Sequence, residues 1–261
     1  MNGQTILEAR GLTMRFGGLT AVKNFNASIP KGSIVGLIGP NGAGKTTCFN
    51  MISGFYAPSE GQVLFNGADI TGKPPHQVCR SGLARTFQNI RLFGNGTVLQ
   101  NVLVGCHVRQ KSAWWHSVLM LPSNLREERA MADKSRELLR VVGLEKFAGE
   151  KARSLPYGAQ RRLEIARALA TEPGFLLLDE PAAGMNPQES SELMAFIGDI
   201  RDNFDLTILL IEHDMKVVMG ICEQLWVLDY GEVIAEGPPE QIRANPKVIE
   251  AYLGEECVAH A

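Results

Sequence analysis

The sequence lacks any apolar run long enough to cross a membrane. Its longest apolar stretches, FLLL at residues 175–178 and TILLI at residues 207–211, fall far short of the roughly 20 residues that a membrane helix needs. The start, MNGQTILEAR, has no basic segment followed by an apolar core, so we do not expect a signal peptide. If the protein serves a membrane process, another chain must span the bilayer.

Cysteine and net charge are also scarce. The five cysteines are odd in number, widely scattered and without a C-x-x-C pair, so neither a disulfide framework nor a zinc site is indicated, and a reducing cytoplasm fits best. The 26 Lys and Arg residues nearly balance the 28 Asp and Glu residues, and the net charge of -2 gives no long-range attraction for nucleic acid. We therefore expect no nucleic-acid partner.

The 261 residues, 45% of them hydrophobic, suffice for one large domain or a domain with a subdomain. Residues 4–38 alternate extended segments with glycine turns, and residues 75–170 are mostly helical in pattern and more charged, as in an inserted subdomain. After residue 174, buried strands at 175–180 and 206–212 flank a helix that Asn186 is expected to cap, with Pro187 in its first turn. This alternation predicts a parallel sheet with helical crossovers.

The stretch GPNGAGKTT follows a buried strand and opens a helix, which is the context that a phosphate-binding loop requires. Its backbone N–H groups and the helix N-terminus would hold phosphate oxygens, Lys45 would reach the β and γ phosphates, and the Thr46 hydroxyl would bind Mg²⁺. This motif alone indicates a nucleoside triphosphate. The predicted nucleotide-binding residues of the loop are Gly39, Pro40, Asn41, Gly42, Ala43, Gly44, Lys45, Thr46 and Thr47.

Polar residues follow two of the expected strands. Asp179 and Glu180 end FLLLDE, where Asp179 suits the Mg²⁺ shell and Glu180 could orient or deprotonate the attacking water. Such a pair alone would more often be a solvated strand end, and the phosphate loop reverses that preference. His213, directly after TILLIE, is expected to contact the γ-phosphate. Gln88, in RTFQN, could sense Mg²⁺ or the water, or could be a solvated loop amide.

Three aromatic residues admit two interpretations each. Phe16, in RFGG upstream of the phosphate loop, could stack on adenine or be buried in a hairpin core. Trp114 and Trp115 could dock on a membrane protein, although packing within the helical subdomain is the better expectation for a tryptophan pair.

These motifs together resemble an ATP-binding-cassette (ABC) subunit over essentially the whole chain. GPNGAGKT, Gln88, the segment LPYGAQ at residues 155–160, FLLLDE and His213 stand in the order and approximate spacing of that family. More narrowly, RTFQNIRLF, RRLEIARAL, DEPAAGMNP, IEHDMKVVMGI and NPKVIEAYLGE resemble the G-type ATPase subunit of bacterial high-affinity branched-chain amino acid importers. The related urea and amide importers would look similar.

The resemblance implies an α/β fold of the P-loop NTPase type, with a RecA-like parallel-sheet core, an antiparallel β subdomain and an inserted helical subdomain. Residues 1–88 and 171–261 would form the core with the β subdomain, and residues from about 89 to 170 the helical subdomain that carries the signature segment, residues 155–160. The implied function is ATP hydrolysis with Mg²⁺ that powers uptake of branched-chain amino acids.

The resemblance also implies partners. Two ABC ATPase subunits would pair head to tail, each ATP lying between one subunit's phosphate loop and the other's signature segment, where Tyr157 and Gly158 would contact nucleotide. Integral-membrane permease subunits would bind near Gln88, at the cytoplasmic face of a bacterial inner membrane, and a periplasmic or extracellular amino-acid-binding protein would act indirectly. The apolar residues expected to form this coupling surface are Ile90, Leu92, Phe93, Val98 and Leu99.

Two departures from the family pattern prompt further expectations. The usual LSGGQ is here LPYGA, with Pro156 and Ala159 as replacements, and the usual Asp of the segment after Glu180 is Asn186. Proline is tolerated in the first turn of a helix, so the helix should still form, with a weakened signature. We expect an asymmetric heterodimer with a related ATPase chain.

Two rival functions come from other classes. A soluble cassette protein of translation or DNA repair is disfavoured because the chain has no second cassette, no long coiled-coil insertion and no basic character. A non-hydrolysing, ATP-dependent structural partner is suggested by Pro156.

Overall fold

The computed structural model describes residues 4–109, 122–213 and 215–258. The chain forms two compact units, one of Met1–Arg85 with Gly174–Ala261 and one of Thr86–Pro173. Trp114 and Trp115, expected to pack within the helical subdomain, lie outside the described residues.

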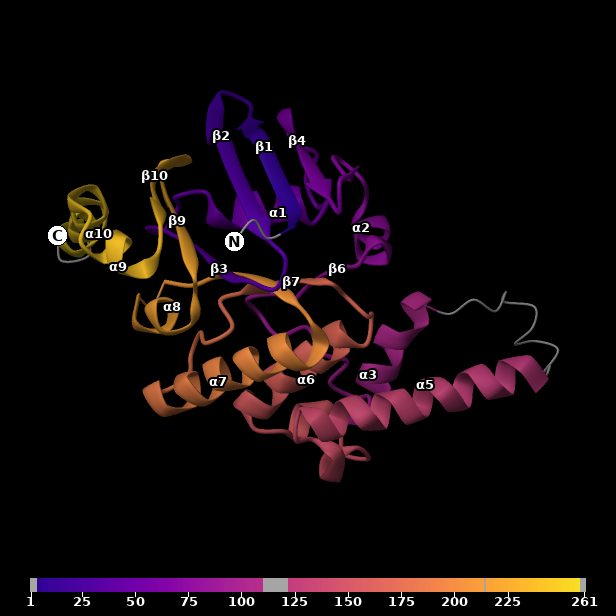
Figure 1. Ribbon diagram of the computed structural model, residues 1–261. Helices are drawn as coiled ribbons and strands as arrows, with labels where there is room; N and C mark the ends of the chain where they lie inside the picture. Colours follow the sequence, from indigo (N-terminus) through magenta and orange to yellow (C-terminus); the bar gives the residue numbers. More distant parts are fainter. Residues whose placement is uncertain (1–3, 110–121, 214, 259–261) are drawn as a thin grey trace. The chain divides into compact units, whose positions relative to one another are not determined.

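A six-stranded sheet forms the centre of the first unit (Figure 1). Its strands, in spatial order, are β10 (Glu232–Gly237), β9 (Gln224–Asp229), β3 (Ile34–Ile38), β8 (Thr207–Ile211), β7 (Phe175–Asp179) and β6 (Leu83–Arg85). All neighbours pair in parallel except β10, which returns antiparallel to β9. The expected parallel sheet is confirmed, and the short strand β6 is its one member from within the mostly helical residues 75–170.

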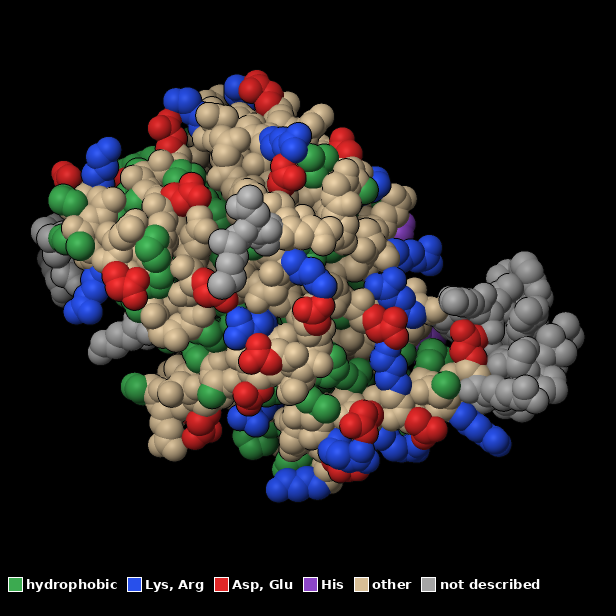
Figure 2. Space-filling view, in the orientation of Figure 1, with side chains coloured by type: hydrophobic (Ala, Val, Ile, Leu, Met, Phe, Trp, Pro, Cys, Tyr) green, Lys and Arg blue, Asp and Glu red, His purple; other side chains and the backbone are tan. Residues whose placement is uncertain are grey.

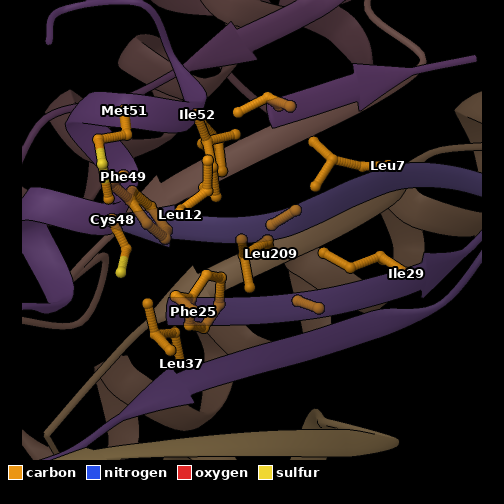
Figure 3. Close-up of a cluster of buried hydrophobic side chains, with 14 of the residues drawn as sticks. Leu7, Leu12, Phe25, Ile29, Leu37, Cys48, Phe49, Met51, Ile52 and Leu209 are labelled. Atoms are coloured by element: carbon orange, nitrogen blue, oxygen red, sulfur yellow. The ribbon is translucent and has the colours of Figure 1, made fainter. Parts of the chain in front are cut away.

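The central strands are buried on both faces, which explains their unbroken apolar sequences. Alternate residues such as Leu37, Phe175 and Leu209 join a core that also contains residues of β1, β2, β4 and α1. Figure 3 shows this cluster, in which Phe25, Leu37 and Leu209 lie between neighbouring elements. Burial on both faces makes the sheet a rigid support for groups placed at its edge.

The second sheet of this unit is antiparallel, with the order β2 (Leu19–Pro30), β1 (Thr5–Phe16), β4 (Glu60–Phe65) and β5 (Ala68–Asp69). The Asn66-Gly67 pair joins β4 to β5 with positive φ angles of 50° and 74°, the conformation that a two-residue hairpin turn requires. The antiparallel β subdomain expected from the sequence is thereby confirmed.

Six helices of the described residues belong to the first unit: α1 (Lys45–Ile52), α2 (Pro75–Ser81), α7 (Pro187–Phe204), α8 (Met215–Ile221), α9 (Pro239–Arg243) and α10 (Pro246–Val258). Helix α1 is shorter than the apolar spacing of Phe49, Ile52 and Phe55 suggests. It ends at Ile52 because Gly54 has a φ of 78°, and Phe55 is left 45% exposed. None of the described helices combines the length and apolarity needed to cross a membrane.

The second unit consists mainly of α3 (Val98–Cys106), α5 (Pro122–Val141) and α6 (Tyr157–Leu169). Helices α3 and α6 pack closely at Gly105. The absence of a side chain there permits the contact, since a Cβ on Gly105 would lie only 2.4 Å from the carbonyl oxygen of Arg167. Buried Asn101 bonds both the N–H and the carbonyl of Phe93, whose ring is 56% exposed. Of the expected coupling residues, Val98 is fully buried and Phe93 is the most exposed.

Charged side chains of both signs are interspersed on the face shown in Figure 2, as the nearly balanced composition suggests. The buried charged residues of the described chain are few and all belong to networks of hydrogen bonds, the most extensive of which involve Arg85, Arg161 and Glu212.

Helix α7 begins with the expected cap. The Asn186 Oδ1 accepts the Glu189 N–H at 2.9 Å, and the Glu189 Oε2 accepts the Asn186 N–H at 3.0 Å, which together form a capping box.

We predict that Asn186→Ala lowers the free energy of unfolding by about 1 kcal/mol, because the Glu189 N–H loses its side-chain partner. Asn186→Asp, which keeps an acceptor at the same position, serves as the matched control and should stay within about 0.5 kcal/mol of the original chain. Urea denaturation of the three full-length proteins measures the difference. Equal stability of the Ala and Asp variants would contradict a role for the cap.

Candidate nucleotide site

The phosphate loop joins the end of β3 to α1. Lys45, only 7% exposed, bends back over the loop, and its Nζ donates to the carbonyl oxygens of Gly39 and Pro40 at 2.6 and 2.8 Å. Asn41, Gly42 and Thr46 are exposed. The loop is therefore held closed from within, while its polar tip faces outward.

The glycines of this loop are required by close backbone contacts as well as by conformation. Gly39 has a φ of 148°, and a Cβ there would lie 2.0 Å from the Leu228 carbonyl oxygen. Gly44 has a φ of 102°, and a Cβ there would lie 2.6 Å from the Ala21 carbonyl oxygen. The Gly231 N–H donates to the Ala43 carbonyl. The turn between β9 and β10 thus supports the loop.

Strand β8 lies between β3 and β7, so the carboxyl ends of these three parallel strands meet at one edge of the sheet. Strand β3 leads into the phosphate loop, β7 ends at Asp179 with Glu180 next, and β8 is followed by Glu212 and His213. This is the edge at which open α/β sheets bind ligands. The structure thereby brings together the sequence-predicted residues of the phosphate loop, Asp179, Glu180 and His213.

Asp179 forms a buried ion pair. The Arg85 guanidinium, from neighbouring strand β6, donates to the Asp179 Oδ2 at 2.8 Å, and both side chains are less than 10% exposed. Arg85 also donates to the Asn50 Oδ1 and the Ser53 Oγ of the α1 segment. Arg85 fixes the orientation of Asp179 and ties strand β7 to the helix that follows the phosphate loop.

Glu180 has a strained backbone. Its φ of 44° is left-handed, a conformation that costs a non-glycine residue about 1–2 kcal/mol. The Glu180 N–H donates to the Ile211 carbonyl at 3.0 Å, which holds the residue in this conformation against the end of β8. The Glu180 Oε2 lies 3.7 Å from the His213 Nδ1. Strain of this kind collects at functional sites, where surrounding contacts determine the conformation.

Glu212 is a buried carboxylate beside this pair. Its Oε1 accepts the Ala182 N–H at 2.8 Å, and its Oε2 accepts the His213 N–H at 3.3 Å. The side chain is 1% exposed, and burial raises the pKa of this carboxyl, against the opposing effects of the Ala182 hydrogen bond and of His213. Glu212 therefore connects the segment that follows Glu180, through the Ala182 N–H, to His213.

Phe16 and Tyr56 form an exposed aromatic pair in the first unit. Phe16 is 43% exposed and meets Tyr56 edge to face, with ring centroids 5.5 Å apart. Such exposure leaves a ring face accessible to an adenine, so stacking by Phe16 stays a prediction.

Gln88 and the signature segment belong to the second unit. Gln88 is exposed and lies three residues beyond the end of β6. Buried Arg161 donates to the carbonyl oxygens of Phe87 and Gln88 at 2.8 and 2.9 Å and to the Glu164 carboxylate at 2.8 Å. This network holds the backbone around Gln88 to helix α6.

Pro156 is the N-cap of α6 rather than a residue of its first turn. It has an extended conformation, with φ -55° and ψ 153°, and no side chain caps the helix. Tyr157 is exposed and Gly158 half-buried at the start of the helix. The expectation that the helix forms despite Pro156 is confirmed, and the position of the proline is corrected.

The donors at the edge of the sheet fit Mg²⁺. The exposed Thr46 hydroxyl and the Asp179 carboxylate supply hard oxygen donors, the kind that Mg²⁺ prefers. Within the described parts of the chain, no three His, Cys, Asp or Glu side chains cluster so as to hold a metal ion. A site with few protein donors suits Mg²⁺ that is bound largely through substrate phosphates and water.

Sequence reasoning missed Arg85, Glu212 and Arg161. Each is charged within a run of apolar or helix-forming residues, a pattern that signals a buried pair or a functional group. The partners could not be read from the sequence, because they depend on which strands and helices are neighbours.

The raised pKa of Glu212 predicts a pH-dependent stability. The unfolded carboxyl ionises near pH 4.3, and the folded one ionises at higher pH, so wild-type stability falls as pH rises through the interval between them. Glu212→Gln is neutral throughout, and its amide oxygen can still accept the Ala182 N–H.

We expect the unfolding free energy of Glu212→Gln, relative to the original chain, to increase between pH 4.3 and pH 7. Urea denaturation over that range measures it, and Glu240→Gln, at an exposed position of α9, controls for the loss of one carboxylate. A difference that stays constant with pH would show that the Glu212 pKa is unchanged by folding.

Comparisons with known proteins agree with this geometry. A family model described as ABC transporter matches residues 22–183, and one described as branched-chain amino acid ATP-binding cassette transporter matches residues 232–258. The chain is 49% identical to the high-affinity branched-chain amino acid transport ATP-binding protein LivG of Escherichia coli (strain K12), over 97% of this chain and 99% of the relative. It is 48% identical to BraF of Pseudomonas aeruginosa, of the same description, over 96% and 98%.

Solved structures show the same fold. An ATP-binding cassette of an ABC transporter in its ADP conformation has a TM-score of 0.85 and 32% identity, over 96% of this chain and 99% of that one. A dimeric ATP-binding cassette in a post-hydrolysis state, bound to ADP and phosphate, has a TM-score of 0.74 and 26% identity, over 90% and 99%. The chain therefore belongs to the ABC transporter family, as one of its ATPase subunits.

Proposed function

We propose that this chain is the ATP-hydrolysing subunit of an importer for branched-chain amino acids. The observation that carries the proposal is the 49% identity over 97% of the chain to a relative of that description, together with the second family match at residues 232–258. The site described above supplies the residues that ATP hydrolysis requires.

The residues divide into binding and chemical roles. Lys45, with the backbone of residues 39–47, would bind the phosphates, and Phe16 would stack on adenine. Glu180 would orient and polarise the attacking water, because it is partly exposed at the edge of the sheet from which the phosphate loop starts. His213 would contact the γ-phosphate, held near Glu180 by Glu212. Gln88 would sense the metal or the water.

Thr46 and Asp179 would hold Mg²⁺, with Gln88 as a third candidate. The bound ion would neutralise negative charge on the phosphates. Arg85 orients the Asp179 carboxylate by direct donation at 2.8 Å. The ion pair is buried, so breaking it would leave an uncompensated charge.

Partners follow from the family. The chain would act with integral-membrane permease subunits that bind near Gln88 and Phe93, at the cytoplasmic face of the membrane, and a periplasmic or extracellular amino-acid-binding protein would deliver the solute. A second ATPase subunit would complete the nucleotide site, and the existence of a dimeric cassette structure with the same fold supports such pairing. In that dimer, the signature segment, with Tyr157 and Gly158, would face the partner's nucleotide.

Two alternative functions can be distinguished from this one by subunit identification and by a transport assay. A urea or amide importer would have a similar ATPase, and a non-transport cassette protein would lack permease partners. Purification from the native membrane followed by identification of subunits, and uptake of labelled leucine against labelled urea in proteoliposomes, separates these possibilities. The match at residues 232–258 favours leucine.

We predict opposite behaviours for two site variants. Glu180→Gln should keep ATP affinity but reduce turnover by at least about 10³-fold, because the amide cannot accept a proton from water. Lys45→Ala should weaken ATP binding itself by about tenfold or more. ATP titration and steady-state hydrolysis in the assembled complex measure both effects. Normal turnover in the Glu180→Gln complex would remove Glu180 from this role.

We further predict an asymmetric heterodimer. Pro156 carries no hydroxyl and no N–H, and the loss of one donor aimed at developing charge costs about 10²-fold to 10³-fold in rate. Because the signature segment serves the partner's site, that defect falls on the partner's nucleotide. Disabling this chain's Glu180 should then cost more turnover than disabling the corresponding glutamate of the partner subunit.

The matched gain-of-function variant is Pro156→Ser with Ala159→Gln, which should raise hydrolysis at the partner's site alone. Serine would also cap α6, so thermal denaturation of the variant separates stability from turnover. Equal losses from the two glutamate changes would reject the asymmetry.

A further inference from the structure

Helices α8, α9 and α10 line an open pocket of about 410 Å³ in the first unit. The volume falls within the range typical of small-molecule sites. The lining residues, two from α8, two from α9 and three from α10, are Met215, Met219, Ile242, Arg243, Val248, Ile249 and Tyr252.

The lining is apolar apart from two polar groups. Ile242 and Val248 are buried at its base, 1% and 3% exposed, and the two methionines have unbranched side chains that adapt to the shape of an occupant. Arg243 and the Tyr252 phenol are the polar members of the lining. Such a surface fits a compact aliphatic group with one polar end.

The charge of the described lining favours an anion at the polar end of a ligand. Arg243, the one charged residue of that lining, lies at an exposed position in the last turn of α9. The described lining contains no acidic residue that could pair with an ammonium group. A monocarboxylate therefore matches the lining better than a zwitterionic amino acid does.

We propose that this pocket binds a small branched aliphatic monocarboxylate, with its carboxylate on Arg243 and its alkyl branch between the methionines and Ile242. Two sources share this chemistry: the 2-oxo acids that remain when branched-chain amino acids lose their amino group, and short branched fatty acids. The choice of a branched chain rests on the proposed function, because residues 232–258, which supply most of the lining, match the branched-chain family model.

Occupancy of the pocket would act on the nucleotide site through α8. Met215 lies two residues after His213, so an occupant in contact with Met215 constrains the chain next to that histidine. Val218 of α8 and Cys222 just after the helix lie next to β3, where a Cβ on Gly36 would lie 3.2 Å from Val218 and 3.1 Å from Cys222. Helix α8 thus links the pocket to the strand that enters the phosphate loop.

Calorimetric titration of the full-length protein tests the site directly. The probes are 4-methyl-2-oxopentanoate and 4-methylpentanoate, with L-leucine and acetate as controls. We expect both branched acids to bind with a Kd of about 1 mM or tighter, and leucine and acetate to bind at least about tenfold more weakly. No binding of either branched acid at 10 mM, or leucine binding as tightly as they do, would overturn the proposal.

The two branched acids also separate the sources. A preference for 4-methyl-2-oxopentanoate assigns the site to 2-oxo acids, and equal affinities or a preference for 4-methylpentanoate assign it to short fatty acids. Either result keeps the shared chemistry of an alkyl branch and a carboxylate.

Two variants locate the binding. Arg243→Gln should weaken the branched acids by about tenfold, and Met219→Gln, nearly the same in size, should weaken them by making the wall polar. Arg136→Gln, an exposed arginine on α5, is the charge control and should bind as the original chain does. Thermal denaturation verifies that each variant is folded. Unchanged affinity in both pocket variants would reject this location.

The link through α8 has its own readout. In the assembled complex, saturating branched acid should change ATP turnover at least twofold, and Arg243→Gln should abolish that change while keeping basal turnover. Binding without any change in turnover would reject the link. Because the titration needs neither permease nor transport, a failure of the proposed transport function would not alter its result.

Discussion

The nucleotide site depends on the position of one strand, β8, between β3 and β7. Parallel pairing brings the ends of three strands together, although their residues come from positions near 39, 179 and 212 of the chain. The hydrogen bond from the Glu180 N–H to the Ile211 carbonyl extends this pairing one residue past the end of β7. A shift in register by one residue would turn Asp179 to the other face and remove it from Arg85.

Charge at this edge is organised in pairs that limit its energetic cost. Arg85 faces Asp179 inside the protein, and Glu212 accepts two backbone N–H groups, whereas His213 is largely exposed. Buried ions without partners would destabilise the fold by several kcal/mol each. The site therefore holds one carboxylate fixed by an arginine and leaves Glu180 closer to solvent, where water can reach it.

Much of this arrangement was predictable from the sequence because its signals are local. The apolar runs that become β3, β7 and β8, the glycines of the phosphate loop and the Asn186 cap each depend on a few adjacent residues. What could not be predicted depends on distant neighbours. Strand β6 pairs with β7, and this pairing brings the Arg85 side chain next to Asp179, a contact that the sequence around Arg85 does not show.

A distinction between side-chain and backbone groups explains how the altered signature segment can still be functional. At the phosphate loop, one side chain, Lys45, carries a charge that backbone groups cannot replace. At the start of α6, the groups that would meet an anion are mainly the N–H groups of the first helical turn, which any residue except proline provides. Pro156 precedes that turn as the N-cap, so the N–H groups of Tyr157 and Gly158 are retained. Proline in place of serine at the cap therefore removes one hydroxyl and one N–H from the segment without changing the direction of its dipole.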